Sequence, residues 1–115
     1  MAFSTEELKN VQSILTLWLA VNRPEDEIRD QLDYGYTIKN QDIFLETIRP
    51  IPTDPSKKGH YPFAKIKYIG TSRLWKIYWM RGNLKWHPYD PFSETDALED
   101  ALQKIMEDSY GCFFG

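Results

Sequence analysis

The stretch from Arg73 to His87 constrains the fold more than any other, because it holds three of the four tryptophans within two runs of β-favouring residues. Gly82 and Asn83 lie between the two runs, and such a pair is typical of a two-residue hairpin turn. That turn predicts four facing pairs: Arg81 with Leu84, Met80 with Lys85, Trp79 with Trp86, and Tyr78 with His87. Directly opposite residues point to the same side of a sheet, so the hairpin is expected to have two unlike faces.

A third strand, from Tyr61 to Ile69, continues these two faces. If the turn over residues 70–73 spans four residues, Lys67 lies opposite Lys76 and Ala64 lies opposite Trp79. One face then carries Ala64, Ile66, Tyr68, Trp75, Ile77, Trp79 and Trp86. The other face carries Phe63, Lys65, Lys67, Lys76, Tyr78, Met80, Lys85 and His87.

Apolar residues at helical spacing predict one helix near each end of the chain. Ser4 followed by Glu7 is a capping box, and it precedes a helix expected over residues 5–21. The apolar stripe of this helix consists of Leu8, Val11, Leu15, Trp18 and Leu19. Ser93 and Asp96 indicate the start of a second helix. Its stripe consists of Ala97, Leu98, Ala101, Leu102, Ile105 and Met106.

Alternating residues between the helices predict two more strands, at 32–38 and 43–49, joined by a polar turn at 39–42. The proline-rich segment 50–59 is expected to be the longest loop, because proline cannot donate a hydrogen bond within a sheet. The predicted fold is a single two-layer α+β domain over residues 1–115. An antiparallel meander of four to five strands has an N-terminal and a C-terminal helix on its tryptophan face (α-β-β-β-β-β-α).

The composition limits where such a domain works. No apolar run reaches transmembrane length, and the first residues lack the basic and then apolar pattern of a signal peptide. The single cysteine, Cys112, cannot form an internal disulfide, which fits a reducing compartment. We therefore expect a cytoplasmic location and no membrane contact.

Several motifs in this chain resemble a bacterial protein family. The residues from Trp75 to Arg81, those from Leu84 to His87, and Tyr89 and Pro91 are similar to the family called domain of unknown function 3024. The same resemblance extends to Ile28-Arg29, Gln31 to Asp33, Gly35-Tyr36, Ile48 to Pro50 and the closing Cys112 to Gly115. It covers nearly the whole chain and implies a small bacterial stand-alone domain. That family has no established activity or cofactor, so the resemblance supplies no site residues.

The sequence predicts no enzyme, cofactor or metal site. His87 beside Tyr78 is more simply a half-exposed strand histidine than a base or ligand, because no second ligand is placed near it. Cys112 lies in an apolar ending, which favours an inert buried thiol over a nucleophile. Asp33 and Glu46 would share one sheet face, as carboxylates do in metal-dependent nucleases, but the Glu-x-Lys pair of those enzymes is absent. A nuclease-like enzyme is therefore only a distant alternative.

The face away from the tryptophans is the predicted functional surface. Between Pro55 and Tyr89 there are eight Lys or Arg residues, eight aromatic residues and no acid, although the whole chain carries a net charge of −3. The candidate binding residues are Lys65, Lys67, Lys76, Tyr78, Met80, Lys85 and His87.

Two kinds of partner fit the residues of this surface. Tyrosine and methionine favour protein interfaces, so we expect a protein-interaction or self-association surface. The alternative is single-stranded nucleic acid, whose bases stack on aromatic rings while lysines neutralise phosphates, although the acidic net charge opposes it. Lys67 and Lys76 face each other and repel, so an anion should lie nearby, either Glu46 or a phosphate from outside.

Overall fold

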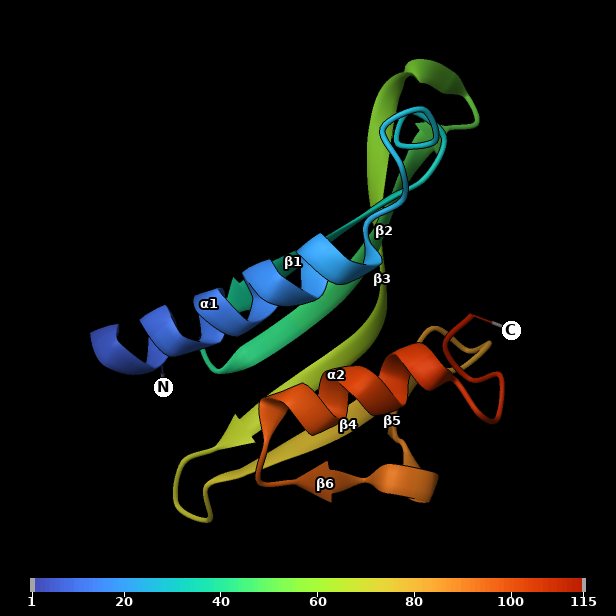
Figure 1. Ribbon diagram of the computed structural model, residues 1–115. Helices are drawn as coiled ribbons and strands as arrows, with labels where there is room; N and C mark the ends of the chain where they lie inside the picture. The colour runs from blue at the N-terminus through green and yellow to red at the C-terminus, as the bar shows by residue number, and fades with distance from the viewer. Residues whose placement is uncertain (1, 115) are drawn as a thin grey trace.

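The computed structural model describes residues 2–114, which form an α+β domain with one antiparallel sheet (Figure 1). The elements in order are α1 (Thr5–Asn22), β1 (Asp33–Lys39), β2 (Asp42–Ile51), β3 (Asp54–Ile69), β4 (Leu74–Met80), β5 (Trp86–Pro88), a 3₁₀ turn (Asp90–Phe92), β6 (Glu94–Thr95) and α2 (Leu98–Glu107). The predicted fold class is confirmed. Among the described helices, none is both long enough and apolar enough to cross a membrane.

The sheet is a meander in the order β1-β2-β3-β4-β5, and the short β6 pairs with β4 beside β5. Two predicted registers are confirmed. The β1–β2 turn places Gly35 opposite Glu46, and the β3–β4 turn places Lys67 opposite Lys76 and Ala64 opposite Trp79. Both turns contain a residue with positive φ, Asn40 and Arg73.

Both helices lie on the same side of the sheet, with α1 over β1 and β2 and α2 over β4 (Figure 1). Their apolar stripes and the inner sheet face form one core. The side chains buried most completely include Leu15, Ile43, Leu45, Ile66, Ile77, Leu98 and Ile105. We call the opposite side of the sheet, which no described helix covers, the open face.

The start of α2 differs from the prediction. The Ser4–Glu7 capping box of α1 is present, with Glu7 N donating to Ser4 Oγ at 3.1 Å. In contrast, Ser93 and Asp96 do not cap α2, which begins at Leu98. Residues 94 and 95 form β6 instead, and Ile77 N donates to Ser93 O at 3.0 Å. Strand β5 is short, so the remaining edge of β4 is free to pair with this segment.

The proline-rich segment 50–59 is not a loop, which corrects the prediction. Strands β2 and β3 continue past β1 as a two-stranded arm, paired to Pro50–Lys58 and closed at Ile51 and Asp54 (upper part of Figure 1). In a two-stranded arm each strand is an edge, so a proline can direct its missing N–H away from its partner. Alternation alone could not distinguish this arm from a loop.

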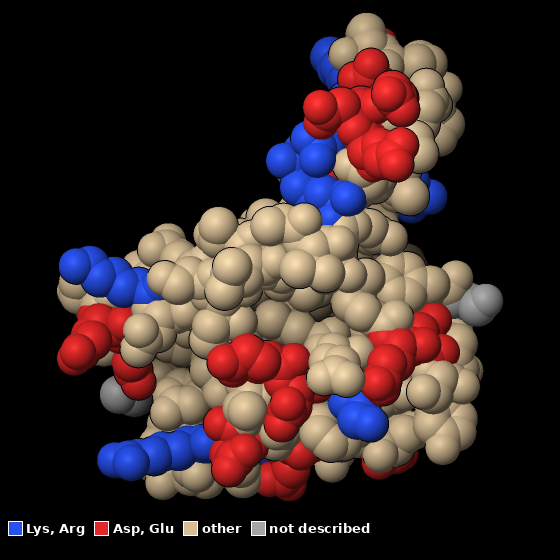
Figure 2. All heavy atoms as spheres, in the orientation of Figure 1, with Lys and Arg blue, Asp and Glu red and all other residues tan. Residues whose placement is uncertain are grey.

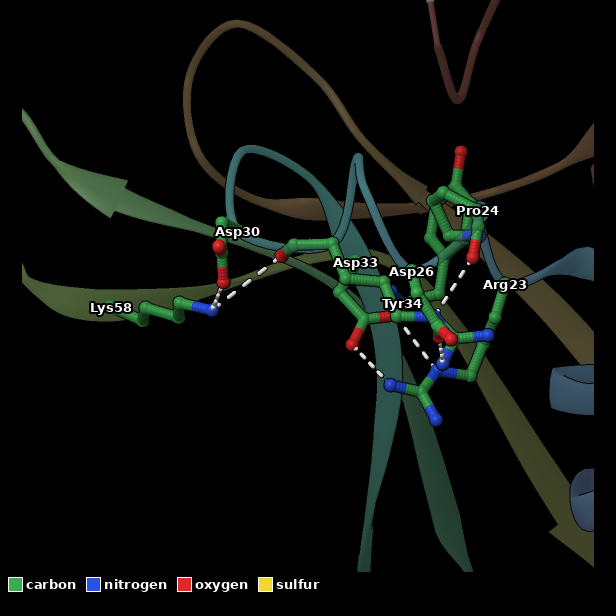
Figure 3. A network of polar contacts seen from close by, with 8 residues as sticks. Arg23, Pro24, Asp26, Asp30, Asp33, Tyr34 and Lys58 are labelled. Atoms are coloured by element: carbon green, nitrogen blue, oxygen red, sulfur yellow. Dashed lines mark hydrogen bonds and ion pairs between the residues drawn. The ribbon is translucent and has the colours of Figure 1, made fainter.

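A network of ion pairs connects residues 23–33 with the base of the arm (Figure 3). Arg23 binds both carboxylate oxygens of Asp33, with Nε–Oδ1 at 2.9 Å and Nη2–Oδ2 at 2.6 Å. Arg29 pairs with Asp26, and Lys58 of the arm lies 3.6 Å from Asp30. The hydrogen bond from Arg23 holds the pKa of Asp33 below its usual value.

We predict that Asp33→Asn destabilises the domain at neutral pH but not in acid. Because the pKa of Asp33 is lowered on folding, its carboxylate contributes stability above the unfolded pKa of about 3.9, and this contribution is lost as the pH falls further. The measurement is the free energy of unfolding by urea, for wild type and variant, at several pH values. Glu27→Gln is the matched control, because that side chain is exposed and no salt bridge joins it to another described residue. An unfolding difference that stays constant down to about pH 3 would contradict the prediction.

Candidate functional site

The turn between β4 and β5 determines which side chains reach the open face. It is a three-residue loop, in which Leu84 N donates to Arg81 O at 2.8 Å and Leu84 has a φ of 61°. A type I turn followed by a left-handed residue is a standard three-residue hairpin. The predicted two-residue turn is therefore wrong, and the register of β5 shifts by one residue.

This shift exchanges the faces of Trp86 and His87. Trp86 lies opposite Met80, so it belongs to the open face and not to the core. His87 lies opposite Trp79 on the helix side, and its Nε2 atom is buried without a hydrogen-bond partner among the described residues. Lys85 lies two residues before His87, so its side chain points to the same side of the hairpin as that of His87. It is exposed beside the turn. Two predicted site residues, Lys85 and His87, are thus not part of the open face.

Phe63 also differs from the prediction, because β3 contains a bulge. Leu45 pairs with Ala64, but the next residue, Glu46, pairs with Pro62, so Phe63 has no partner on β2. A bulge redirects the inserted side chain. Phe63 is buried and packs on Phe114, with 4.8 Å between ring centres.

The open face carries a row of charged residues that crosses the whole sheet. The register places one residue of every strand except β5 in this row: Lys39 of β1, Asp42 of β2, Lys67 of β3, Lys76 of β4 and Glu94 of β6. No salt bridge joins these five side chains to one another or to other described residues. The register thus places Asp42 and Glu94 beside the Lys67–Lys76 pair, and not Glu46, which was one of the two expected anions.

A row of aromatic residues lies beside the charged row. Phe44 of β2, Lys65 of β3 and Tyr78 of β4 are consecutive across the strands. The Lys65 ammonium lies 5.9 Å from the Phe44 ring centre and 5.4 Å from that of Tyr78, within the range of cation–π attraction. Trp86 reaches Phe44, with 6.1 Å between ring centres, although β3 and β4 separate their strands. The Phe44 and Trp86 side chains must therefore extend toward each other across the open face, and both are half exposed.

The two carboxylates of the nuclease-like alternative are each engaged by other residues. Asp33 is bound by Arg23. Glu46 is buried, accepts a hydrogen bond from Thr37 at 3.1 Å, and lies 3.5 Å from His60. Within residues 2–114, no three His, Cys, Asp or Glu side chains gather as a metal site.

A groove between α1 and α2 is a second candidate site, which the sequence analysis did not identify. Its volume is about 520 Å³. Its lining residues are Ile14, Leu17, Trp18, Val21 and Asn22 of α1, and Glu99, Leu102, Gln103, Met106 and Glu107 of α2. Figure 2 shows the hollow, with acidic side chains gathered on its α2 side. Trp18 Nε1 is buried without a hydrogen-bond partner among the described residues.

The sequence contained a signal for this groove. Leu17 and Val21 are apolar residues outside the predicted core stripe of α1. They are 68% and 82% exposed, and both line the groove. An apolar stripe that packs on the core does not explain Leu17 and Val21, which lie outside it. These two residues indicate a second apolar surface on the same helix.

The fold defines a small α+β domain with one antiparallel sheet and two helices on one of its faces. The family described as Domain of unknown function (DUF3024) matches residues 3–115, and the chain belongs to it. No curated protein matches the chain, and no solved structure matches it.

We predict that Gly82→Ala leaves the stability unchanged or raises it by up to about 1 kcal/mol. In a two-residue type II′ turn Gly82 would need a positive φ, and alanine there would cost about 1–2 kcal/mol. In the three-residue loop its φ is not positive, and a Cβ would meet no atom within 4 Å. Leu84→Gly should be stabilising because it relieves the left-handed leucine. Urea unfolding of both variants is the measurement, and a loss of stability in Gly82→Ala would contradict the assigned register.

We predict that Cys112 reacts slowly with a thiol reagent in the native protein. The side chain is half buried, and burial, reinforced by the Asp108 carboxylate, raises the pKa of the thiol. Thiolate, the reactive form, is therefore scarce at neutral pH. The measurement compares labelling rates with and without denaturant. Equal rates under the two conditions would contradict the prediction.

Proposed function

We propose that the domain is a protein-interaction module that self-associates into a two-fold dimer through its open face. The observation that carries the proposal is the charge order of the cross-strand row, which reads Lys39, Asp42, Lys67, Lys76, Glu94. Most homo-oligomers are closed and symmetric, and a two-fold interface needs a surface complementary to itself.

The charged row is complementary to the same row of a second copy when the two rows run in opposite directions. With a two-fold axis along β3, the row of one copy meets that of its partner in the opposite order. Lys39 then faces Glu94, and Asp42 faces Lys76, so four pairs of opposite charge form across the interface. Two lysines of β3 meet their own copies near the axis, Lys67 in the charged row and Lys65 in the aromatic row. Opposite charges placed so favour this arrangement over displaced ones.

The aromatic row supplies the apolar part of the same interface. Under the same symmetry Phe44 of one copy faces Tyr78 of the other. These rings are half exposed in the monomer, and burying their remaining apolar surface contributes about 25 cal/mol per Å². Aromatic residues are also enriched in the centres of protein interfaces.

The charges favour a second copy over single-stranded nucleic acid. A phosphate backbone needs a basic track, whereas Asp42 and Glu94 interrupt the lysines of this row. Lys65 is already placed between two rings, which leaves it less free to meet a phosphate. Nucleic-acid binding is therefore one of the outcomes that the test distinguishes.

The test exchanges charges across the proposed axis. Sedimentation equilibrium should give a wild-type mass of twice the 13.6 kDa of one chain. Lys39→Glu and Glu94→Lys should each weaken the dimer, because each places like charges together. The double variant, which exchanges the two charges, should restore it. Both positions are exposed, so neither change disturbs the core.

Lys9→Glu is the matched control, since it makes the same charge change at an exposed position of α1. It should leave the mass unchanged. A wild-type mass of one chain at all concentrations, or a double variant that stays monomeric, would overturn the proposal. Binding of a single-stranded oligonucleotide that falls steeply with added salt would replace it with the nucleic-acid alternative.

A further inference from the structure

We propose that the groove between α1 and α2 binds an amphipathic helix of a partner protein, with apolar residues facing the groove and basic residues along one edge. The groove lies on the helix side of the sheet, so it is separate from the open face. Three features carry the proposal: its apolar walls, its length and its acidic border.

The walls of the groove are apolar, and part of their apolar surface is exposed to water in the monomer. Leu17 and Val21 are mostly exposed, and they line the same groove as the buried Trp18. With Ile14, Leu102 and Met106 they form one continuous surface on both helices. Large contiguous apolar patches of this kind are uncommon on the surface of monomers and mark binding sites.

The dimensions suit a helix. The 18 residues of α1 extend about 27 Å, and the 10 residues of α2 extend about 15 Å. The groove runs between them, and a second hollow of about 400 Å³ that shares Ile14 and Glu99 continues it toward the start of both helices. A helix of three to four turns laid in such a groove presents anchors at positions i, i+3, i+4 and i+7.

The charged residues along the edges of the groove determine which charge the bound helix should carry. Glu99 and Glu107 lie along the α2 side, and Glu7 and Asp96 border the continuing hollow. Glu107 is paired with Lys104 at 3.6 Å, so Glu99 is the acid of the α2 side without a described ion pair. Arg73 is the one base among the residues that line either hollow in the described chain. An acidic border attracts lysine or arginine on the partner and repels carboxylate or phosphate head groups, which disfavours a fatty acid or an anionic membrane.

The test uses a synthetic helical peptide of about four turns, with leucine at the four anchor positions and lysine on the flanks. Calorimetry with the full-length protein should show saturable binding of one peptide per chain. A peptide with glutamate in place of each lysine should bind at least about tenfold more weakly, equivalent to about 1.4 kcal/mol. A scrambled peptide of the same composition should not bind.

Matched variants locate the binding site. Leu17→Lys removes an exposed apolar wall and should weaken binding about tenfold. Gln12→Lys, an exposed position of α1 that does not line the groove, should have no effect. Glu99→Lys should weaken binding of the lysine peptide and improve that of the glutamate peptide. Asp100→Lys, its neighbour in the first turn of α2 outside the groove, is the charge control. The indole N–H resonance of Trp18, identified by its loss in Trp18→Phe, should shift when the lysine peptide binds.

Three results would overturn the proposal. The first is no difference between the lysine peptide and its scrambled form. The second is equal binding by wild type and Leu17→Lys, which would place the peptide elsewhere. The third is a difference in self-association between Leu17→Lys and wild type, which would mean that a second copy occupies the groove. The first two results do not depend on whether the open face forms a dimer, because the peptide titration can be repeated in Lys39→Glu, in which that dimer should be weakened.

Discussion

The rest of the structure depends on the burial of a row of isoleucines that crosses four strands. Ile38, Ile43, Ile66 and Ile77 lie side by side in register, and the last three are completely buried beneath the helices. A slip of one residue in any strand would bring its isoleucine to the open face, so this row fixes the pairing. The neighbouring residue in each strand must then point away from the helices. The charged row of the open face is therefore a consequence of the register that the isoleucines impose.

The sequence predicted the parts of the fold where alternation and turn chemistry agree. The β1–β2 and β3–β4 pairs have the expected registers because polar turns at 39–42 and 70–73 separate clear alternating runs. The prediction failed at four places. Leu84 and the unpaired Phe63 each add one residue to a strand connection or strand, the prolines lie in a paired arm, and α2 begins at Leu98 without a cap from Ser93 or Asp96. A leucine with positive φ is uncommon, and a bulge has no distinctive residue type, so neither could be read from the residues alone.

The candidate surfaces were predictable to different degrees. Five residues of the predicted face, Lys65, Lys67, Lys76, Tyr78 and Met80, follow directly from the strand register and do lie on the open face. The residues that depended on the second hairpin do not. The width of the groove could not be predicted from the sequence, because it depends on the positions at which α1 and α2 pack on the sheet. Sequence shows which side of α1 is apolar, but not how far α2 lies from it.

The distribution of charge follows from this layered arrangement. The segment without acids forms most of β3 and β4, so lysines collect on the open face, and the two acids of the charged row come from β2 and β6. Acids of α1 and α2 lie on the other side of the sheet, around the groove. The buried isoleucine row lies between the two surfaces, so the sheet separates substitutions on opposite faces. Their effects on stability should therefore add, and a departure from additivity would show that the sheet itself transmits strain between the faces.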